Sequence, residues 1–445
     1  MAGHPDQRLV NSIISGFEIG FDIGFKGKLT NTFPKNNKSA FVHKQGVTEA
    51  VCKEIARGHT AGPFATPPFP INHISPLGAV PKPDGSIRLI MDLSQPKGES
   101  INDFISKEEF PCKYTPFDEA TRLVRQSGKG SFLTKIDIKH AYRLLPVRPE
   151  DWPLLVYHWE GHYCVDLKLP FGGRSSASIF TDFADLVCWI INNRYDLVVI
   201  HYSDDYLLIS LAILTLAVNQ KETMLAVFRY LNIPVADDKL IGPATSLPYL
   251  GIEIDTVSMR TAVPKDKLEA TLHLLPKWQG RRTATKQQLL SLIGKLQNIS
   301  LVVRPGRLFL RRLIDLSCTV KELNHHINLN TEARKDTYNG GVIGFLLGTR
   351  PRSSPRLSPS LVLTYACSPT PLGLGLGQYI EQTGSKQNGT KYAPVRTWTS
   401  RSCSPSWLQP THGVINGRAS ASFSLPTTYQ SPRCGKKGPR RPLTS

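Results

Sequence analysis

The central part of the chain alternates short, β-rich apolar runs with segments of helical periodicity. The run Ile87–Leu93, for example, alternates as a strand does. It follows the turn signal Pro83-Asp84-Gly85, which predicts a hairpin with Lys82 on one arm and Arg88 on the other. Strands mixed with helices in this way indicate an α+β or α/β body over residues 71–258.

Two neighbouring regions have different patterns. Residues 1–70 mix short apolar runs with Gly and Pro, which predicts an extended, turn-rich lead-in. Residues 259–334 have helical periodicity, and Thr285 with Gln288 forms a capping box ahead of an apolar helical face. We therefore expect a helical subdomain to follow the α+β body.

Residues 335–445 differ again in composition. They hold fourteen Lys or Arg residues against two acids, Asp336 and Glu381, with many Ser, Pro, Gly and Thr. Such a segment buries too little apolar surface to offset the entropy lost on ordering. We expect a largely disordered C-terminal tail.

Two adjacent carboxylates stand between apolar arms. Leu197–Ile200 precedes Tyr202-Ser203-Asp204-Asp205 and a second apolar run follows, which predicts a hairpin with both aspartates at its tip. Paired anions beside apolar material favour a compensating hard cation with oxygen ligands. The chain also contains Asp237-Asp238, which lacks such arms on both sides, and we interpret that pair as a solvated loop.

A third carboxylate ends another short strand. Residues 131–136 read as a strand and Asp137 follows them, at the kind of edge where sheets place ligands, although a turn or helix-capping role is the alternative. Asp137, Asp204 and Asp205 on one sheet can hold two Mg²⁺ ions for phosphoryl transfer, with Mn²⁺ as a substitute. Lys82, Arg88 and Arg174 are candidate cations for a triphosphate.

The bulk composition narrows the class of partner. A formal net charge of +19 favours a polyanion such as nucleic acid, although charge for solubility alone is the simpler alternative. The eight cysteines form no Cys-x-x-Cys pair, and we expect neither a zinc site nor a disulfide framework. The apolar stretch 197–218 contains two aspartates, which argues against a membrane span. Together with the polar start of the chain, these features predict an intracellular protein of the cytoplasm or nucleus.

Several ordered motifs resemble those of reverse transcriptases. Tyr202–Asp205 resembles their Tyr-x-Asp-Asp box, Leu169-Pro170-Phe171-Gly172 resembles the Leu-Pro-x-Gly segment, and Pro248–Glu253 resembles the primer grip. In detail the chain is most similar to DIRS-type retrotransposon polymerases, the tyrosine-recombinase class, and more distantly to retroviral and hepadnaviral polymerases. The resemblance implies a right hand of fingers, palm and thumb, with an antiparallel palm sheet.

The resemblance also implies roles for individual residues. Asp137, Asp204 and Asp205 would bind the metal ions and act in catalysis. The nucleotide site would comprise Lys82, Arg88, Tyr142, Phe171, Gly172 and Arg174. Contacts to primer and template would come from Tyr202, Leu250, Gly251, Arg304 and Arg307. The partners would be an RNA template, a DNA primer and deoxynucleoside triphosphates.

The chain departs from the family pattern in its tail. Such polymerases usually continue into a ribonuclease H domain, and residues 361–368 faintly resemble its first strand, but Tyr365 stands where the catalytic Asp would be. We expect a degenerate ribonuclease H region without nuclease activity. The competing hypothesis for the whole chain is a catalytically silent transposon remnant that only binds nucleic acid, and a DNA-templated polymerase is a third possibility.

Overall fold

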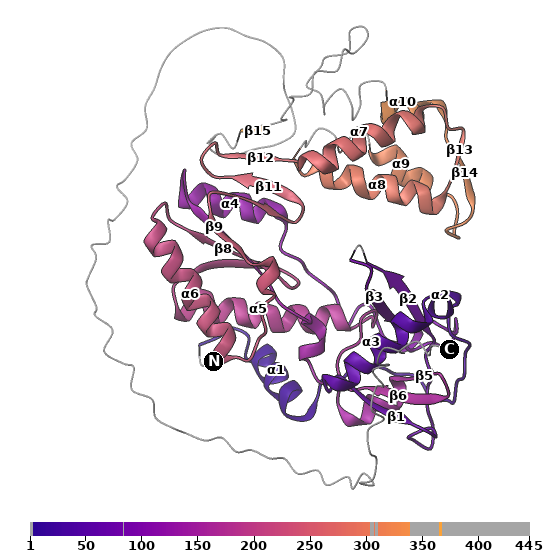
Figure 1. Ribbon diagram of the computed structural model, residues 1–445. Coiled ribbons are helices and arrows are strands. Elements are labelled where there is room, and N and C mark those ends of the chain that lie inside the picture. The colour runs from indigo at the N-terminus through magenta and orange to yellow at the C-terminus, as the bar shows by residue number, and fades with distance from the viewer. Residues whose placement is uncertain (1–2, 83, 303–306, 308–309, 339–364, 367–445) are drawn as a thin grey trace, which may run out of the picture. The chain divides into compact units, whose positions relative to one another are not determined.

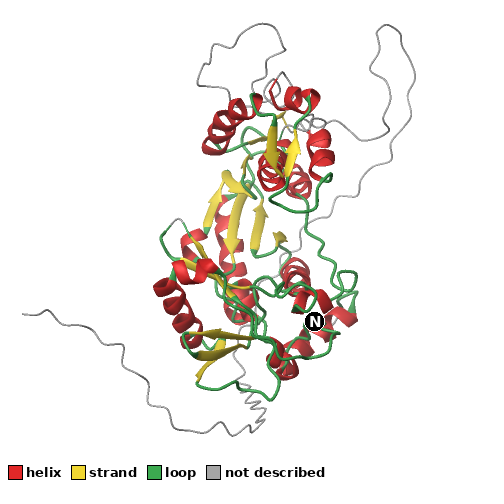
Figure 2. Ribbon diagram, turned by 90° about the vertical axis from the view of Figure 1, so that its right-hand side faces the viewer, coloured by secondary structure: helices red, strands yellow, loops and turns green. Residues whose placement is uncertain are grey.

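The central sheet contains four antiparallel strands (Figures 1 and 2). The computed structural model describes residues 3–82, 84–302, 307, 310–338 and 365–366. The strand order in the central sheet is β7 (Val198–Tyr202), β8 (Asp205–Ser210), β4 (Phe132–Asp137) and β9 (Ile241–Ala244). This arrangement confirms the predicted α+β class with an antiparallel palm sheet.

Alternate residues of the central sheet face two different hydrophobic clusters, as strand geometry requires. Tyr206 and Leu208 belong to the larger cluster, whereas Leu207 and Ile209 belong to the other. Three helices cover the sheet: α4 (Phe117–Ser127), α5 (Ser176–Arg194) and α6 (Leu214–Tyr230). Helices α5 and α6 contribute to the larger cluster and α4 to the second, so the sheet is covered on both faces.

The N-terminal region joins the larger cluster, so the expectation of an extended lead-in over residues 1–70 is wrong. It contains α1 (Gln7–Ile19), α2 (Lys38–Val42), α3 (Lys44–Ala56) and β1 (Thr60–Phe64). Strand β1 pairs with β6 (His162–Asp166), which pairs in turn with β5 (Val156–Trp159). Val10 and Ile13 of α1 are buried at a helical spacing, and Asp6 caps this helix through the N–H groups of Arg8 and Leu9.

The predicted hairpin around residue 85 is confirmed. Strand β2 (Leu77–Pro81) pairs with β3 (Ile87–Met91), and Val80 lies opposite Arg88. Met91 belongs to the same buried cluster as Ile136 of β4, so this hairpin and the palm sheet share a core. Four short 3₁₀ helices complete this part: η1 (Ile101–Phe104), η2 (Ala141–Leu144), η3 (Pro149–Leu154) and η4 (Asp237–Lys239).

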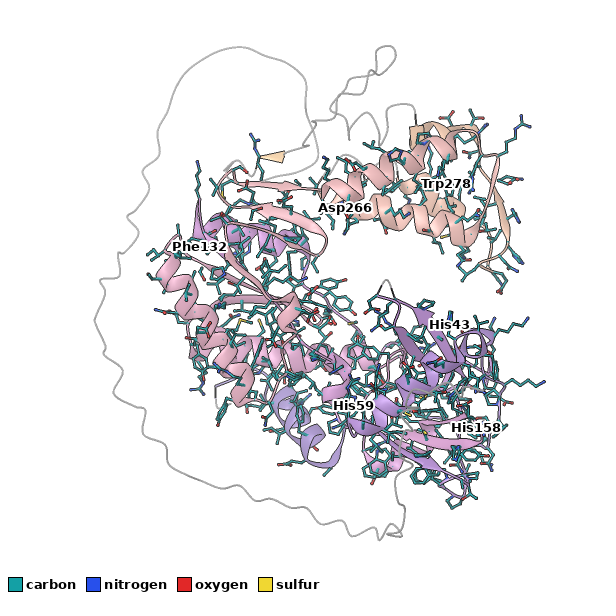
Figure 3. All side chains as sticks on the ribbon, in the orientation of Figure 1. His43, His59, Phe132, His158, Asp266 and Trp278 are labelled. Atoms are coloured by element: carbon teal, nitrogen blue, oxygen red, sulfur yellow. The ribbon has the colours of Figure 1, made fainter. Side chains whose placement is uncertain are left out.

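The region after the palm sheet is mainly helical, as predicted. A sheet of β10 (Ser246–Tyr249), β11 (Ile252–Asp255) and β12 (Arg260–Ala262) leads into α7 (Lys265–Gln279), α8 (Lys286–Ser300), α9 (Leu310–Ser317) and α10 (Thr331–Tyr338). The capping box at Thr285 and Gln288 is confirmed at the start of α8. Trp278 of α7 is buried with the leucines of α8 (Figure 3). The sequence pattern did not indicate the short pair β13 (Thr283–Thr285) and β14 (His326–Asn328).

The end of this region bears on the expected domain limits. Helix α10 continues past residue 334, the predicted limit of the helical part. Strand β15 (Tyr365–Ala366) pairs with β12. The rest of the predicted tail lies outside the described residues, and the domain limits stay a prediction.

Two further findings concern the described residues as a whole. None of the helices described there is long and apolar enough to cross a membrane. The cysteines described there are free thiols, namely Cys52, Cys112, Cys164, Cys188 and Cys318.

Candidate active site

Three aspartates occupy adjoining backbone positions at one edge of the palm sheet. Strand β4 ends at Asp137 and strand β8 begins at Asp205, and these two residues lie directly opposite each other in the antiparallel pair. The two-residue turn Ser203–Asp204 joins β7 to β8. The N–H of Ile138 donates to the carbonyl of Asp204 at 3.0 Å, so the turn is tied to the end of β4. The structure therefore brings the backbone of Asp137, Asp204 and Asp205 together.

Two lysines balance the charge of these carboxylates. The Lys239 ammonium lies 3.0 and 3.1 Å from the two carboxylate oxygens of Asp137. Lys135 Nζ lies 3.0 Å from Asp205 Oδ1. Lys239 follows Asp237-Asp238 in η4, where both aspartates are exposed, as expected of a solvated pair. The segment that was interpreted as a solvated loop therefore contributes a cationic side chain, Lys239, to the site.

The electrostatics at Asp137 favour a cation. Burial raises the pKa of the Asp137 carboxyl above its ordinary value, the Asp205 carboxylate acts in the same direction, and Lys239 opposes both. Conversely, the hydrogen bond to Asp137 raises the pKa of Lys239. The charge of the buried carboxylate is therefore held largely by one lysine.

The side chains at this edge differ in how well they suit a metal ion. Among the residues that the structure describes, no three or more His, Cys, Asp and Glu side chains are grouped so that they could hold a metal ion. The chemistry of the donors nevertheless fits a hard divalent ion, because they are carboxylate oxygens on adjoining backbone positions. Each of Asp137 and Asp205 already pairs with a cationic group.

An aromatic layer lies next to the carboxylates. The ring of Tyr142, in η2, is 5.2 Å between centroids from Phe171 and 5.2 Å from Phe180 of α5. Burial raises the pKa of the Tyr142 phenol, and the Asp204 carboxylate adds to this effect. Gly172 has a left-handed backbone (φ 95°), and its carbonyl accepts a hydrogen bond from Asn102 Nδ2 at 3.0 Å. Tyr142, Phe171 and Asp204 are therefore neighbours.

A buried network of ion pairs lies next to this aromatic layer. The Arg143 guanidinium lies 3.2 Å from Glu54 of α3 and 2.7 Å from Asp166 of β6. Its central carbon is 6.0 Å from the centroid of the Phe171 ring. The network links the N-terminal region to the aromatic layer beside the carboxylates.

Three further residues that were predicted to contact primer or template lie on two hairpins. Tyr202, at the end of β7, stacks on Tyr114 with ring centroids 4.6 Å apart. Leu250 and Gly251, both with positive φ, form the turn between β10 and β11. Their carbonyls each accept a hydrogen bond at 3.3 Å, from Asn298 Nδ2 and Lys267 Nζ respectively. The helical region thereby contacts this turn directly.

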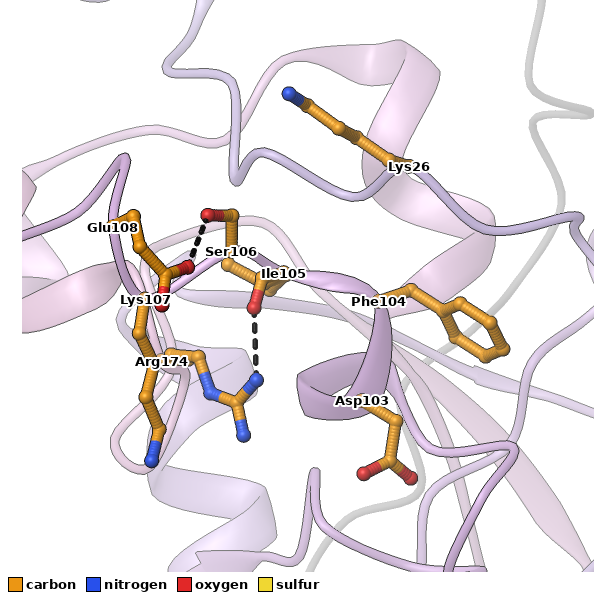
Figure 4. Close-up of a pocket in the computed structure, with 8 residues that line it drawn as sticks. All are labelled: Lys26, Asp103, Phe104, Ile105, Ser106, Lys107, Glu108 and Arg174. Carbon is orange, nitrogen blue, oxygen red and sulfur yellow. Dashed lines mark hydrogen bonds between the residues drawn. The ribbon is translucent and has the colours of Figure 1, made fainter.

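The lysine and arginine residues predicted to bind the triphosphate or the template do not lie together. Lys82 and Arg88 are exposed at the β2–β3 hairpin. Arg174 lies apart from them in a hollow of about 420 Å³, where its guanidinium donates to the Ile105 carbonyl at 2.8 Å (Figure 4). Arg307 is exposed, and Arg304 lies outside the described residues. The structure therefore does not gather Arg174 with Lys82 and Arg88 around one hollow.

Comparison with known proteins identifies the central part of this chain. Residues 80–254 match the family model described as "Reverse transcriptase (RNA-dependent DNA polymerase)". These residues form a reverse transcriptase domain. The domain includes β4, β7 and β8, and Asp137, Asp204 and Asp205 lie within it.

Individual relatives of the reverse transcriptase domain come from foamy viruses. The Pro-Pol polyprotein of Simian foamy virus type 1 is 27% identical over 119 residues, which is 26% of this chain and 10% of that protein. The corresponding polyprotein of Feline foamy virus is 29% identical over 125 residues, covering 26% of this chain and 9% of that protein. The chain thus matches about a tenth of the length of these curated relatives.

Solved structures support the same fold. A foamy viral protease-reverse transcriptase in complex with double-stranded DNA has a TM-score of 0.52 and 17% identity, and covers 73% of this chain and 50% of that one. The same enzyme in complex with an RNA/DNA hybrid has a TM-score of 0.50 and 16% identity, with 76% and 43% covered. At this identity, the likeness shows that the described residues have the fold of a reverse transcriptase.

Some residues around the reverse transcriptase site were not indicated by the sequence. Lys239 contacts a carboxylate 102 positions away, and no local pattern reports such a pairing. Tyr114 lies in a segment without apolar periodicity. Lys135 lies in a predicted strand in which only Asp137 was given a functional role. For Lys135 a signal existed, because alternate residues of a strand share a face and Lys135 and Asp137 are two positions apart.

Proposed function

We propose that this chain is an RNA-directed DNA polymerase of a retroelement, which adds deoxynucleotides to the 3′ end of a primer. One observation carries the proposal. Within the reverse transcriptase domain, Asp137 lies opposite Asp205 in the sheet and Asp204 stands in the adjoining turn. Phosphoryl transfer needs clustered oxygen ligands of this kind, because its catalysis is mostly positioning and charge stabilisation.

Two divalent ions, Mg²⁺ or Mn²⁺, are the cofactor that this donor set suits. When bound by Asp137, Asp204 and Asp205, they would activate the primer 3′-hydroxyl and neutralise the leaving pyrophosphate. The chain itself holds the oxygen ligands at the rigid end of two paired strands. Lys239 pairs with Asp137 and Lys135 pairs with Asp205, so a bound metal ion would compete with these two lysines for the carboxylate oxygens.

The nucleotide would lie between the β2–β3 hairpin and the aromatic layer. Lys82 and Arg88 are exposed cations that would bind the triphosphate. Tyr142 would lie under the sugar, with Phe171 and Gly172 lining the pocket, because Tyr142 neighbours Asp204 and its ring packs on Phe171. Arg174 is the third cation assigned to this nucleotide site. Its guanidinium donates to the Ile105 carbonyl in a separate hollow, so it would have to change its partner to bind the triphosphate.

Nucleic acid is the proposed partner. Foamy viral enzymes of this fold have been solved with double-stranded DNA and with an RNA/DNA hybrid. We infer that an RNA template and a DNA primer bind here, with contacts from Tyr202, Leu250, Gly251, Arg304 and Arg307. The net charge of +19 supports this inference.

The source element is proposed from the sequence motifs alone. Gly62-Pro63-Phe64, Ser75-Pro76-Leu77-Gly78 and residues 303–308 are most similar to DIRS-type retrotransposon polymerases. Residues 303–306 and 308 lie outside the described part of the chain.

Primer extension on an RNA template with Mg²⁺ tests the proposed function. We expect the wild-type protein to extend the primer, and Asp204→Asn or Asp137→Asn to slow extension by more than about 100-fold, beyond the 10- to 100-fold typical of residues that only support a metal ligand. Affinity for the template should barely change, because Lys and Arg supply it. Asp237→Asn is the matched control, because this exposed aspartate lies outside the site.

The alternative hypothesis makes the opposite prediction. A silent remnant would bind the primer–template with similar affinity but would not extend it in any variant. Extension on a DNA template with none on RNA would instead indicate a DNA-templated polymerase.

A further inference from the structure

His201 is a buried histidine directly beside the catalytic turn. It is the fourth residue of β7, and 5% of its side chain is exposed. Its Nε2 lies 2.8 Å from Asp185 Oδ1 of α5, and its Nδ1 lies 3.3 Å from the carbonyl oxygen of Ser203. Its ring stacks on Tyr206 of β8, with centroids 5.3 Å apart. None of the roles assigned above uses this side chain.

The chemistry of these contacts is specific. Both partner atoms are acceptors, a carboxylate oxygen and a backbone carbonyl oxygen. A ring nitrogen of His201 forms a hydrogen bond to either acceptor only when that nitrogen carries hydrogen. The 2.8 Å between Nε2 and Asp185 Oδ1 is the length of a direct hydrogen bond.

The carbonyl held by His201 belongs to the strained residue of the turn. Ser203 has φ 56°, a left-handed conformation that costs free energy in a residue with a side chain. The next residue is Asp204. A change in the orientation of the Ser203–Asp204 peptide would therefore move the Asp204 carboxylate relative to Asp137.

Helix α5 also forms hydrogen bonds with the rest of β7 and with the start of β8. Asn192 of this helix exchanges two hydrogen bonds with the backbone of Val199, at 2.9 and 2.8 Å. The Tyr206 hydroxyl donates to the Ala184 carbonyl at 3.3 Å. The contact from Asp185 through His201 extends this support to the turn itself.

We propose that His201 and Asp185 are positioning residues that hold the Ser203–Asp204 turn in its catalytic conformation. Asp185 is 55% exposed, so the hydrophobic core does not need its side chain. Its side chain instead contacts the buried imidazole of His201, next to the turn. The effect on the turn stands independently of the proposed function, whereas the effect on catalysis rests on it.

Hydrogen exchange of the metal-free protein tests the effect on the turn. Asp185→Asn removes the negative charge from the contact with His201, and His201→Phe keeps a ring on Tyr206 but removes both ring nitrogens. We expect amide exchange in the peptide spanning residues 197–210 to accelerate about tenfold in each variant, with no further acceleration in the double variant. His201→Gln, which can donate to one partner, should fall between wild type and His201→Phe.

A matched control distinguishes this effect from a loss of negative charge on α5. Asp182→Asn removes a carboxylate one turn earlier in the helix, and no contact between Asp182 and the turn is found in the described structure. It should not accelerate exchange in residues 197–210. If Asp185→Asn exchanges like wild type, or if Asp182→Asn has the same effect as Asp185→Asn, the positioning role is wrong. Asp185→Asn keeps the test valid even if His201→Phe does not fold.

Steady-state kinetics tests the consequence for catalysis. In Asp185→Asn, we expect kcat for nucleotide addition to fall about tenfold and the Mg²⁺ concentration for half-maximal rate to rise, while the KM for deoxynucleotide stays the same. A larger KM at unchanged kcat would contradict the assignment. If the wild-type protein does not polymerise, the proposed function fails, but the exchange measurement still decides the role of His201.

Discussion

Tyr142 is the residue at which sugar selection is best tested. Its ring packs between Phe171 and Phe180 and neighbours Asp204, and by its resemblance to reverse transcriptases it would lie under the deoxyribose. A bulky ring there should collide with a 2′-hydroxyl. Tyr142→Val should therefore admit ribonucleotides, with a loss of discrimination of about tenfold or more, equivalent to about 1.4 kcal/mol. Single-nucleotide incorporation measures this ratio.

The matched variant for this prediction is Tyr142→Phe. It keeps the ring and removes only the hydroxyl, so it should discriminate as the wild type does. Unchanged discrimination in Tyr142→Val, or equal loss in both variants, would show that the ring does not exclude the 2′-hydroxyl.

Asp182 provides a prediction about stability and pH. The pKa of this carboxyl is raised from 3.8 to about 6, first by desolvation and then by repulsion from Asp185 and Asp6. The folded protein therefore disfavours its ionised form, so ionisation lowers the free energy of unfolding as pH rises from about 4 to about 6. Asp182→Asn removes this penalty, and its melting temperature should exceed that of the wild type at pH 7.5. The difference should disappear near pH 3.5, and a gain that persists there would contradict this explanation.

At the scale of single elements, α8 begins with a capping box that can be weakened on its own. The N–H of Gln288 donates to Thr285 Oγ1 at 3.3 Å, and the N–H of Thr285 donates to the side chain of Gln288 at 3.2 Å. Thr285→Ala should lower the free energy of unfolding by about 1 kcal/mol. Thr283→Ala, an exposed position in β13, is the control. Urea denaturation followed by circular dichroism compares the two, and equal losses would show that the cap contributes nothing.

Elements defined by local patterns could be predicted from the sequence. The hairpin at Asp204–Asp205 follows from two apolar arms around a polar turn, and the start of α8 follows from Thr285 and Gln288. In both cases residues a few positions apart carry the signal. The N-terminal helices were missed because Gly and Pro runs such as Pro67–Pro70 dominated the interpretation, although Val10 and Ile13 already had helical spacing.

Contacts between elements could be predicted less well. The three aspartates were found because each lies at the end of an apolar run, a position that a sequence displays. Lys239 and His201 were not, because their partners Asp137 and Asp185 are 102 and 16 residues away. Packing of η4 and α5 against the sheet brings these pairs together, and a sequence without its fold does not specify such packing.

At the scale of the whole molecule, the positive charge is concentrated in one part of the chain. Residues 335–445 contribute twelve of the nineteen net positive charges. The charge argument for nucleic acid therefore rests mainly on the predicted tail, whereas the argument for catalysis rests on the reverse transcriptase domain. Binding and polymerisation should accordingly respond to changes in different parts of the chain.

The same division predicts that this chain does not degrade the RNA strand of an RNA/DNA hybrid. Ribonuclease H chemistry needs clustered carboxylates to hold two divalent ions, and after Asp336 the only acid is Glu381. In the stretch that resembles a first nuclease strand, Tyr365 replaces the expected aspartate, and Tyr365–Ala366 pair with β12 instead. Hybrid cleavage by the purified full-length chain, with Mg²⁺ or Mn²⁺, should stay at background. Binding of the hybrid by the basic residues near 433–441 is no substitute for cleavage, whereas specific cutting of the RNA strand would show that carboxylates elsewhere in the chain form a second metal site.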